Sequence, residues 1–282
     1  MKRRSLIRRF GRTARDIVYR LITLGESVMR SRSRTLLPPA HLRLYYYRTL
    51  DPARFERACA EARTELAVQG LQPHHRILDV GSGIGNLALG LAGYLEGSYD
   101  GIEIHREAVE WCQRNITPRH PQFRFHHADL MSHAYNPGGK LSAAEYRFPF
   151  ADRSFDYILL SSVFTHMLPE DVSHYAQEIS RLLAPNGVCV GSFFLLDDES
   201  RRGVEEGRSF MTFEVMHPSR VCRFHDAAVP ESAVAFEESF VRATLHDAGL
   251  QVRDWRRGRW WSGEAHDQDV LAITRSAADA AG

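Results

Sequence analysis

The sequence predicts an α/β fold in which a parallel sheet is covered by helices on both faces. From residue 70 onward, short apolar runs alternate with segments of helical periodicity, a pattern typical of repeated βα units. The first apolar run, 77–80, is followed at once by three alternating glycines, Gly81, Gly83 and Gly85. Such a run indicates a strand buried on both faces, and the glycines indicate a tight turn into a helix.

The elements follow from apolar spacing. Before the glycine turn, the spacing of Phe55, Ala58, Ala62 and Leu66 predicts a helix over 52–69. Further helices are expected over 87–95, 106–115, 169–183 and 237–248, and strands over 99–104, 123–126, 155–161, 188–195, 250–256 and 269–274. A turn-rich segment precedes the last strand, which predicts an antiparallel hairpin at the sheet edge. Two segments, 131–150 and 197–231, are expected as long loops, and loops of that length are often lids or binding loops.

Composition limits the class of protein. The chain has 282 residues, 44% of them hydrophobic, which is enough for one sizeable core with an appendage. Its four cysteines form no C-x-x-C pair, so neither a zinc site nor a disulfide framework is expected, and a reducing compartment is. No apolar run reaches the roughly 18 residues of a spanning helix. The expected location is cytoplasmic, with peripheral contact to the inner face of the membrane as a further hypothesis.

Residues 1–37 form a segment of their own, a basic amphipathic helix. Residues 1–34 contain eleven Lys and Arg against two acidic residues, a net charge of +9, so the rest of the chain carries −8 of the overall +1. The apolar stripe comprises Ile7, Phe10, Ala14, Ile17, Leu21, Leu24 and Val28. Three interpretations stay open: a helix attracted to anionic lipid, a partner helix, and a helix packed on its own domain. The pattern also has features of an organelle transit peptide.

The glycine turn is bracketed by acids at positions typical of a nucleotide site. Asp79 precedes Gly81 by two residues, and Glu103 lies 18 residues after Gly85, at the end of the next expected strand. A carboxylate there can accept hydrogen bonds from both ribose hydroxyls. Because the turn also fits G-x-G-x-x-A, these residues alone leave a nicotinamide-dependent enzyme open. Asp129 follows the third strand, where it can accept from an exocyclic amine such as that of adenine.

The ordered set of motifs resembles class I S-adenosylmethionine-dependent methyltransferases. The resemblance covers about residues 70–275 and is carried by Asp79–Gly85, Glu103, Asp129, 181–187 and the final strand. Residues 148–156 and 161–167 further resemble the small-molecule branch with methyltransferase domains of type 11, 12 or 25. The resemblance implies a Rossmann-like, doubly wound, mostly parallel seven-stranded sheet whose last strand is antiparallel. It also implies a helical lead-in or lid over 38–69 and a methyltransferase domain over 70–282, with acceptor-side insertions at 131–150 and 197–231.

The resemblance also implies the roles of cofactor-binding residues. Gly81, Gly83 and Gly85 would lie under the methionine part and ribose, with Asp79 near the amino end. Glu103 would hold the ribose hydroxyls, with Ile104 on the adenine ring. Asp129 and Leu130 would meet the adenine edge, and Ser161 would close the pocket under the methionine.

His166 is the candidate general base. It follows the fourth strand, at the sheet edge where open α/β sheets bind ligands, and imidazole titrates near neutral pH. A structural role for His166 and a contact role stay open. Tyr46, His217 and Trp260 are the candidate acceptor-binding residues, and Tyr45, Tyr47, His225 and Trp261 are further ones. The histidine pairs lack metal-ligand spacing, so no metal is expected, although some sugar methyltransferases of this superfamily use a divalent cation.

These observations predict an enzyme that transfers a methyl group from S-adenosylmethionine to a small-molecule, saccharide or lipid-linked acceptor, most simply to a hydroxyl oxygen. Two alternatives are a non-enzymatic protein that binds the cofactor and a nicotinamide-dependent oxidoreductase. No specific nucleic acid is expected, because the body of the chain is acidic and Ser161–Phe164 replaces the Asn-Pro-Pro-Tyr type of motif.

Overall fold

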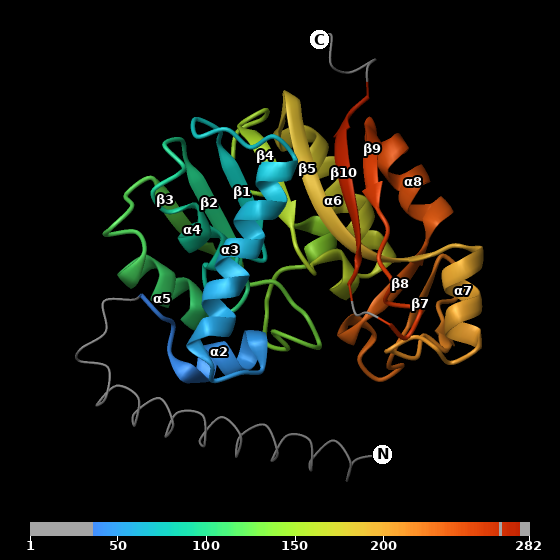
Figure 1. Cartoon of the computed structure of the whole chain (residues 1–282). Coiled ribbons are helices and arrows are strands. Elements are labelled where there is room, and N and C mark those ends of the chain that lie inside the picture. Colours follow the sequence, from blue (N-terminus) through green and yellow to red (C-terminus); the bar gives the residue numbers. More distant parts are fainter. Residues whose placement is uncertain (1–35, 265–266, 277–282) are drawn as a thin grey trace.

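The computed structural model describes residues 36–264 and 267–276, and a mixed β-sheet runs through it (Figure 1). Seven strands have the order β3–β2–β1–β4–β5–β10–β9. Their bounds are β1 (Ile77–Val80), β2 (Tyr99–Glu103), β3 (Phe123–His127), β4 (Phe155–Leu160), β5 (Leu183–Leu196), β9 (Leu250–Arg256) and β10 (Asp269–Arg275). Strands β1 to β5 pair in parallel, and β10 is antiparallel to both β5 and β9. The predicted sheet and its antiparallel last strand are therefore confirmed.

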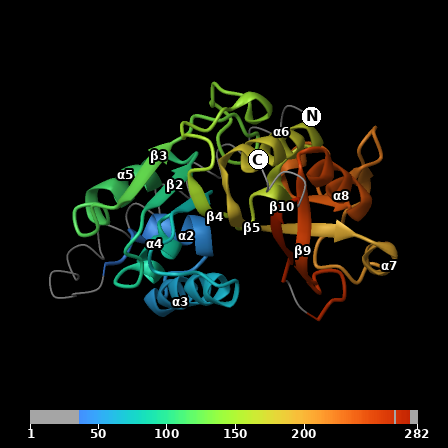
Figure 2. The same ribbon diagram turned by 90° about the horizontal axis from the view of Figure 1, so that it is seen from above.

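The two faces of the sheet carry different helices. Successive side chains of a strand point to opposite faces, so Ile77 and Tyr157 belong to one apolar cluster while Leu78 and Ile158 belong to the other. The first cluster contains side chains of α3 (Pro52–Val68), α4 (Asn86–Leu91) and α5 (Arg106–Asn115), and the second those of α6 (Pro169–Leu182) and α8 (Glu238–Asp247). Figure 2 shows helices on both sides of the sheet, the arrangement of a doubly wound fold.

Most expected elements agree with the structure to within two residues, but α4 and β5 do not. The helix expected over 87–95 ends at Leu91, and Gly93 then takes a φ of 78°, a left-handed conformation that glycine adopts without strain. Strand β5 begins at Leu183 instead of residue 188. A shift of register between Phe155 and Tyr157 of β4 accommodates the extra residues.

The segment 197–231, expected to be an aperiodic loop, contains regular structure. It includes α7 (Asp198–Glu205), β6 (Val215–Met216), β7 (Cys222–Phe224) and the start of the short helix η4 (Pro230–Ser232). A further strand, β8 (Val234–Glu237), pairs in parallel with the far end of β5 and carries the β6–β7 hairpin. Strands of two to four residues are too short to show a period, so the sequence pattern missed this extension.

The segment before the sheet is held by one buried arginine. Helix α2 (Ala40–Tyr47) contains Arg43, which is fully buried and donates hydrogen bonds to the carbonyl oxygens of Pro38 and Leu50. Asp51 then caps α3 by accepting from the Ala53 amide at 3.0 Å. These contacts fix the direction in which α2 presents its tyrosines.

The expected basic amphipathic helical segment, 1–37, lies outside the described residues except for Leu36 and Leu37, which belong to no helix. Within 36–264 and 267–276, no helix is long and apolar enough to cross a membrane.

Candidate functional site

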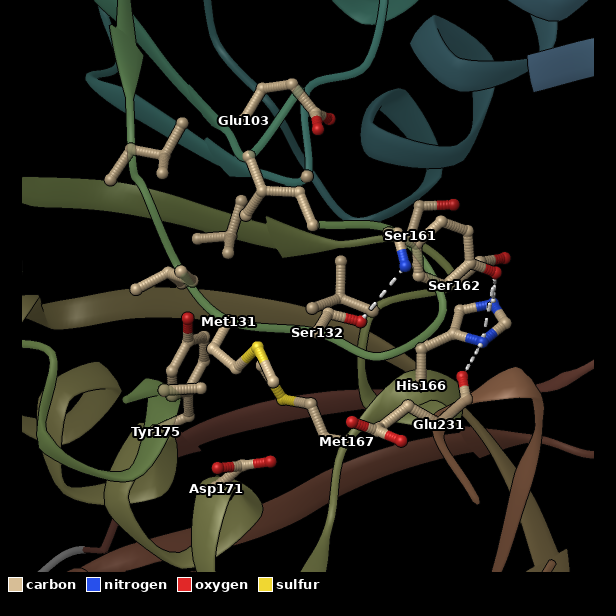
Figure 3. Close-up of a pocket in the computed structure, with 18 of the residues that line it drawn as sticks. Glu103, Met131, Ser132, Ser161, Ser162, His166, Met167, Asp171, Tyr175 and Glu231 are labelled. Atoms are coloured by element: carbon tan, nitrogen blue, oxygen red, sulfur yellow. Dashed lines mark hydrogen bonds between the residues drawn. The ribbon is translucent and has the colours of Figure 1, made fainter. Parts of the chain in front are cut away.

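A cavity of about 400 Å³ opens where β1, β2 and β4 end (Figure 3). Its walls come from these strand ends, from α2, from the loop after β3, and from α6 and η4. Lining residues that the sequence predicted as cofactor-binding are Gly81, Glu103, Ile104, Leu130 and Ser161, and Tyr46 and His166 line the same cavity. Residues that lie far apart in the sequence thus meet at the edge where open α/β sheets bind ligands.

The glycine turn needs glycine at each position. Gly81, Gly83 and Gly85 have φ values of 77°, 54° and 76°. A Cβ atom at Gly81 would lie 2.6 Å from a methyl group of Val163, and one at Gly85 would lie 2.5 Å from Ile116. At Gly83 the nearest atoms belong instead to the Tyr46 ring, at 3.2 Å. Gly83 therefore allows the close approach of α2 to the turn.

Glu103 joins the turn to the end of β2. Its side chain is buried; Oε2 accepts from the Gly83 amide at 2.9 Å and Oε1 from the His105 amide at 2.8 Å. Burial raises the pKa of Glu103, although these amides oppose the shift. Because each carboxylate oxygen can accept more than one hydrogen bond, Glu103 keeps capacity for a ligand's hydroxyl groups.

Tyr46 belongs to the same end of the cavity as Glu103. Its ring packs on Gly83, and its hydroxyl is buried without a hydrogen-bond partner among the described residues. Burial, followed by the charge of Glu103, holds the pKa of Tyr46 well above its usual value, so the phenol stays a donor. The neighbouring Tyr45 ring stacks on His105 with centroids 5.0 Å apart. The structure thus places Tyr46, expected on the acceptor side, beside the expected ribose acid.

Asp79 and Asp129 do not line the cavity. Asp79 is buried on the face that carries α3, α4 and α5, and the Tyr99 hydroxyl donates to it at 2.6 Å. Burial raises the pKa of Asp79 to about 7. Asp129 holds the loop that follows β3, because its Oδ1 accepts from the Asn136 side chain at 3.2 Å and its carbonyl from the amides of residues 140 and 141.

His166 lies at the opposite side of the cavity from Glu103, in the short helix η3 (Phe164–His166). Its Nδ1 is 3.0 Å from the carbonyl oxygen of Glu231, and the Tyr135 hydroxyl lies 3.1 Å from Nε2 and 3.2 Å from Nδ1. Because the carbonyl can only accept, it favours the tautomer with the proton on Nδ1 and a lone pair on Nε2. Burial lowers the pKa of His166, so the imidazole is neutral at physiological pH.

Tyr135 is a residue that the sequence analysis missed. It lies in the loop 131–150 and faces His166 with ring centroids 4.9 Å apart. Asn136 anchors this loop by donating to Asp129 and to the Leu130 carbonyl. The turn at 136–139 and the position directly after β3 were the available signals, but neither shows which side chain turns inward.

The end of β4 adopts an unusual backbone that shapes the cavity wall. Ser162 has a φ of 55°, which is uncommon for a residue other than glycine and is often found at functional sites. Its amide donates to the Ser192 hydroxyl at 2.7 Å, and both hydroxyls donate to the side-chain oxygen of Gln268. This network fixes Ser161 and Val163 at the cavity.

Two expected acceptor residues lie elsewhere. Trp260 is fully buried in a separate apolar cluster with Phe194 and Phe213, and its indole nitrogen donates to Asp269 at 2.8 Å. His217 lies beside the β6–β7 hairpin, where its ring contacts the Ser219 hydroxyl at 2.6 Å. Neither residue lines the cavity: Trp260 lies in the connection between β9 and β10, and His217 lies in the part of the extension next to the β6–β7 hairpin.

Within residues 36–264 and 267–276, no three His, Cys, Asp or Glu side chains lie together so that they could hold a metal ion.

Comparison with known proteins identifies the class. Residues 77–187 match a family model described as a methyltransferase domain. This range runs from β1 into β5 and includes the glycine turn, Glu103 and His166. The match confirms the predicted methyltransferase domain over this range, and the fold is the one predicted for class I S-adenosylmethionine-dependent methyltransferases.

Solved structures with the same fold are similar over most of their length. PH0226 from Pyrococcus horikoshii OT3 is 14% identical, with 78% of this chain and 90% of that chain covered and a TM-score of 0.53. The 1,6-didemethyltoxoflavin-N1-methyltransferase of Burkholderia thailandensis, solved with S-adenosylhomocysteine, is 18% identical (86% and 93% covered, TM-score 0.51). Magnesium protoporphyrin IX methyltransferase from Synechocystis is 15% identical (92% and 99% covered, TM-score 0.51). At these identities the likeness shows the fold.

Proposed function

We propose that this enzyme methylates a hydroxyl oxygen of a small-molecule, saccharide or lipid-linked acceptor, with His166 as general base. The observation that carries the proposal is the placement of His166 in the cavity: the Glu231 carbonyl oxygen lies 3.0 Å from Nδ1, which leaves Nε2 to accept a proton, and the Tyr135 hydroxyl lies beside the ring, 3.1 Å from Nε2. An alcohol is a poor nucleophile until its proton is removed, whereas a neutral amine can attack without a base. A neutral, oriented imidazole therefore favours oxygen as the acceptor atom.

The residues at the Glu103 end fit S-adenosylmethionine. The Glu103 carboxylate can accept from ribose hydroxyls, and the buried Tyr46 hydroxyl, which lacks a partner among the described residues, can donate to the same sugar. Gly81 and Ser161 would lie under the methionine part, and Ile104 and Leu130 would flank the adenine. When bound, the cofactor supplies a sulfonium-activated methyl group as the electrophile.

At the other end, His166 and Tyr135 move the proton. The acceptor hydroxyl gives its proton to the Tyr135 oxygen as the Tyr135 proton passes to Nε2 of His166. The imidazolium formed stays hydrogen-bonded to the Glu231 carbonyl through Nδ1. Met131 and Met167 add apolar surface to the lining of the cavity.

The test compares acceptors with matched skeletons. The enzyme is incubated with S-adenosylmethionine and either a cyclic alcohol or the corresponding amine, and S-adenosylhomocysteine release and the methylated atom are followed by mass spectrometry. The proposal predicts O-methyl products whose formation depends on His166. If only N-methyl product forms, and forms at the same rate in His166→Ala, the enzyme methylates amines and the proposal of O-methylation is wrong. An absence of turnover with every acceptor would favour the non-enzymatic alternative.

We further propose that residues 1–34 bring the enzyme to anionic membrane surfaces. The support is their net charge of +9 and their single apolar stripe. Full-length protein should sediment with vesicles that contain anionic lipid, less so at high salt, whereas protein lacking 1–34 should stay in solution and still bind S-adenosylhomocysteine. If the full-length protein does not bind the vesicles and the truncated protein aggregates, the helix packs on the domain instead.

A further inference from the structure

We propose that the acceptor carries a protonated amine close to its reacting hydroxyl, and that Glu231 and Asp171 bind this ammonium group. This inference rests on the proposed function, because it concerns the acceptor end of the same cavity. It adds a charge requirement to the acceptor that neither the fold nor the family match contains.

Glu231 provides an unused carboxylate oxygen at the acceptor end. The residue is 7% exposed and lines the cavity. Its Oε1 accepts from the backbone amide of His133 at 3.2 Å and from Nδ1 of the His133 ring at 2.7 Å. The other oxygen, Oε2, is buried and has no hydrogen-bond partner among the described residues. A buried carboxylate oxygen without a donor is costly, so this atom indicates a ligand group that donates.

Asp171 is a second carboxylate at this end. It lies in the first turn of α6, where its Oδ2 accepts from the Leu168 amide at 3.0 Å, and it makes no ion pair within the described ranges. Burial raises the pKa of Asp171, and the charges of Glu170 and Glu231 raise it further, so the two cavity carboxylates influence each other. Figure 3 shows both acidic side chains on the side of the cavity opposite to Glu103.

The charges of the cavity favour a cation over a neutral or anionic group. The charged side chains in its lining are Glu103, Asp171, Glu231 and Arg48. Glu103 belongs to the expected ribose site. Arg48 is near Tyr135: burial raises the pKa of Tyr135, and the charge of Arg48 opposes this shift. Two carboxylates thus remain at the acceptor end. They would also offset the repulsion between an ammonium group and the sulfonium of the cofactor, whereas an anionic acceptor would meet two like charges.

Three probes with one skeleton test this charge preference. They are trans-2-aminocyclohexanol, an ammonium at neutral pH; trans-1,2-cyclohexanediol, its neutral analogue; and trans-2-hydroxycyclohexanecarboxylate, the anion. Each is titrated into full-length protein saturated with S-adenosylhomocysteine, and binding is followed by calorimetry or NMR. We expect the ammonium probe to bind at least about tenfold more tightly than the diol, and the carboxylate not to bind.

Conservative variants connect the preference to the two acids. Glu231→Gln keeps an oxygen for His133, and Asp171→Asn keeps an oxygen for the Leu168 amide, so both variants should fold. Each should weaken the ammonium probe about tenfold and leave diol binding and S-adenosylhomocysteine binding unchanged. Glu110→Gln is the control, because this exposed residue of α5 bonds Arg114 and does not line the cavity.

The outcomes separate this inference from the proposed function. If S-adenosylhomocysteine does not bind, the function of the cavity as a cofactor site fails. If it binds but the ammonium probe shows no saturable binding, or binds no better than the diol, only the acceptor inference is overturned. Equal ammonium binding in wild type, Glu231→Gln and Asp171→Asn would overturn it as well.

Discussion

The Nδ1 atom of His166 lies 3.0 Å from the carbonyl oxygen of Glu231, so the residue that offers a carboxylate to the cavity also orients the imidazole through its backbone. His166 belongs to η3, after β4, whereas Glu231 belongs to η4, in the extension beyond β5. The extension is therefore part of the acceptor site. Its side-chain and backbone contributions can be separated experimentally, because Glu231→Gln leaves the carbonyl in place.

Removing the imidazole should slow the reaction without weakening the cofactor. His166→Ala is expected to lower turnover about 10²- to 10⁴-fold, because the acceptor proton loses its base, while S-adenosylhomocysteine affinity stays nearly unchanged. Since burial lowers the pKa of His166, the acidic limb of the kcat/KM profile of the wild type should fall below the ordinary histidine value of about 6.5. A variant that keeps half its activity at every pH would give His166 a structural role.

The hydroxyl of Tyr46 should contribute to cofactor affinity and not to folding. Tyr46→Phe keeps the ring on Gly83 and removes only the buried hydroxyl, which has no partner in the described structure. We expect affinity for S-adenosylhomocysteine to fall about three- to tenfold, and the ligand-free protein to be as stable as the wild type or more so. Calorimetry and thermal unfolding measure the two effects. Unchanged affinity would remove Tyr46 from the cofactor site.

Asp79 should make the ligand-free protein less stable as the pH rises. Its pKa is about 7 when folded because of burial, and about 3.9 in an unfolded chain, so the folded state binds more protons between these values. The free energy of unfolding then decreases as the pH rises from about 4 to about 7. Asp79→Asn removes this titration and should be more stable than the wild type by about 4 kcal/mol at about pH 8, with little difference at about pH 4.

Urea unfolding of Asp79→Asn and wild type at these two pH values measures the effect. Glu110→Gln is a matched control, because it removes a carboxylate that is exposed on α5. If the wild type has the larger free energy of unfolding at the higher pH, the ionised Asp79, hydrogen-bonded to Tyr99, stabilises the fold and the prediction is wrong.

The sheet could be predicted from the sequence because its strands are buried on both faces and therefore appear as continuous apolar runs. The sequence also predicted Glu103 and His166, because residues that follow parallel strands meet at one edge. It did not predict Tyr135 or Glu231, since these lie in segments without a period and reach the cavity through long-range contacts. Trp260 is the opposite case, a residue predicted at the site that lies elsewhere. It is an aromatic residue in a polar stretch, and it packs in a core formed by distant residues such as Phe194.

Charge presents a similar difficulty. Asp79 and Glu103 are both acids at strand ends, yet only Glu103 lines the cavity. Asp79 lies on the same face as Ile77 and bonds Tyr99 across the β1–β2 pair, because strand residues alternate between faces. The spacing of a motif therefore located the site, but the direction of each side chain required the structure.

We expect the cavity beside Glu103 to bind S-adenosylmethionine through the ribose of the cofactor. Calorimetric titration of S-adenosylhomocysteine into wild type and Glu103→Ala tests it most directly, with NAD as the competing ligand. We predict saturable binding to the wild type, none of NAD, and a loss of about 2–3 kcal/mol in folded Glu103→Ala, because charge-assisted hydrogen bonds to the sugar are removed. Equal affinity in a folded Glu103→Ala, or preference for NAD, would contradict the account.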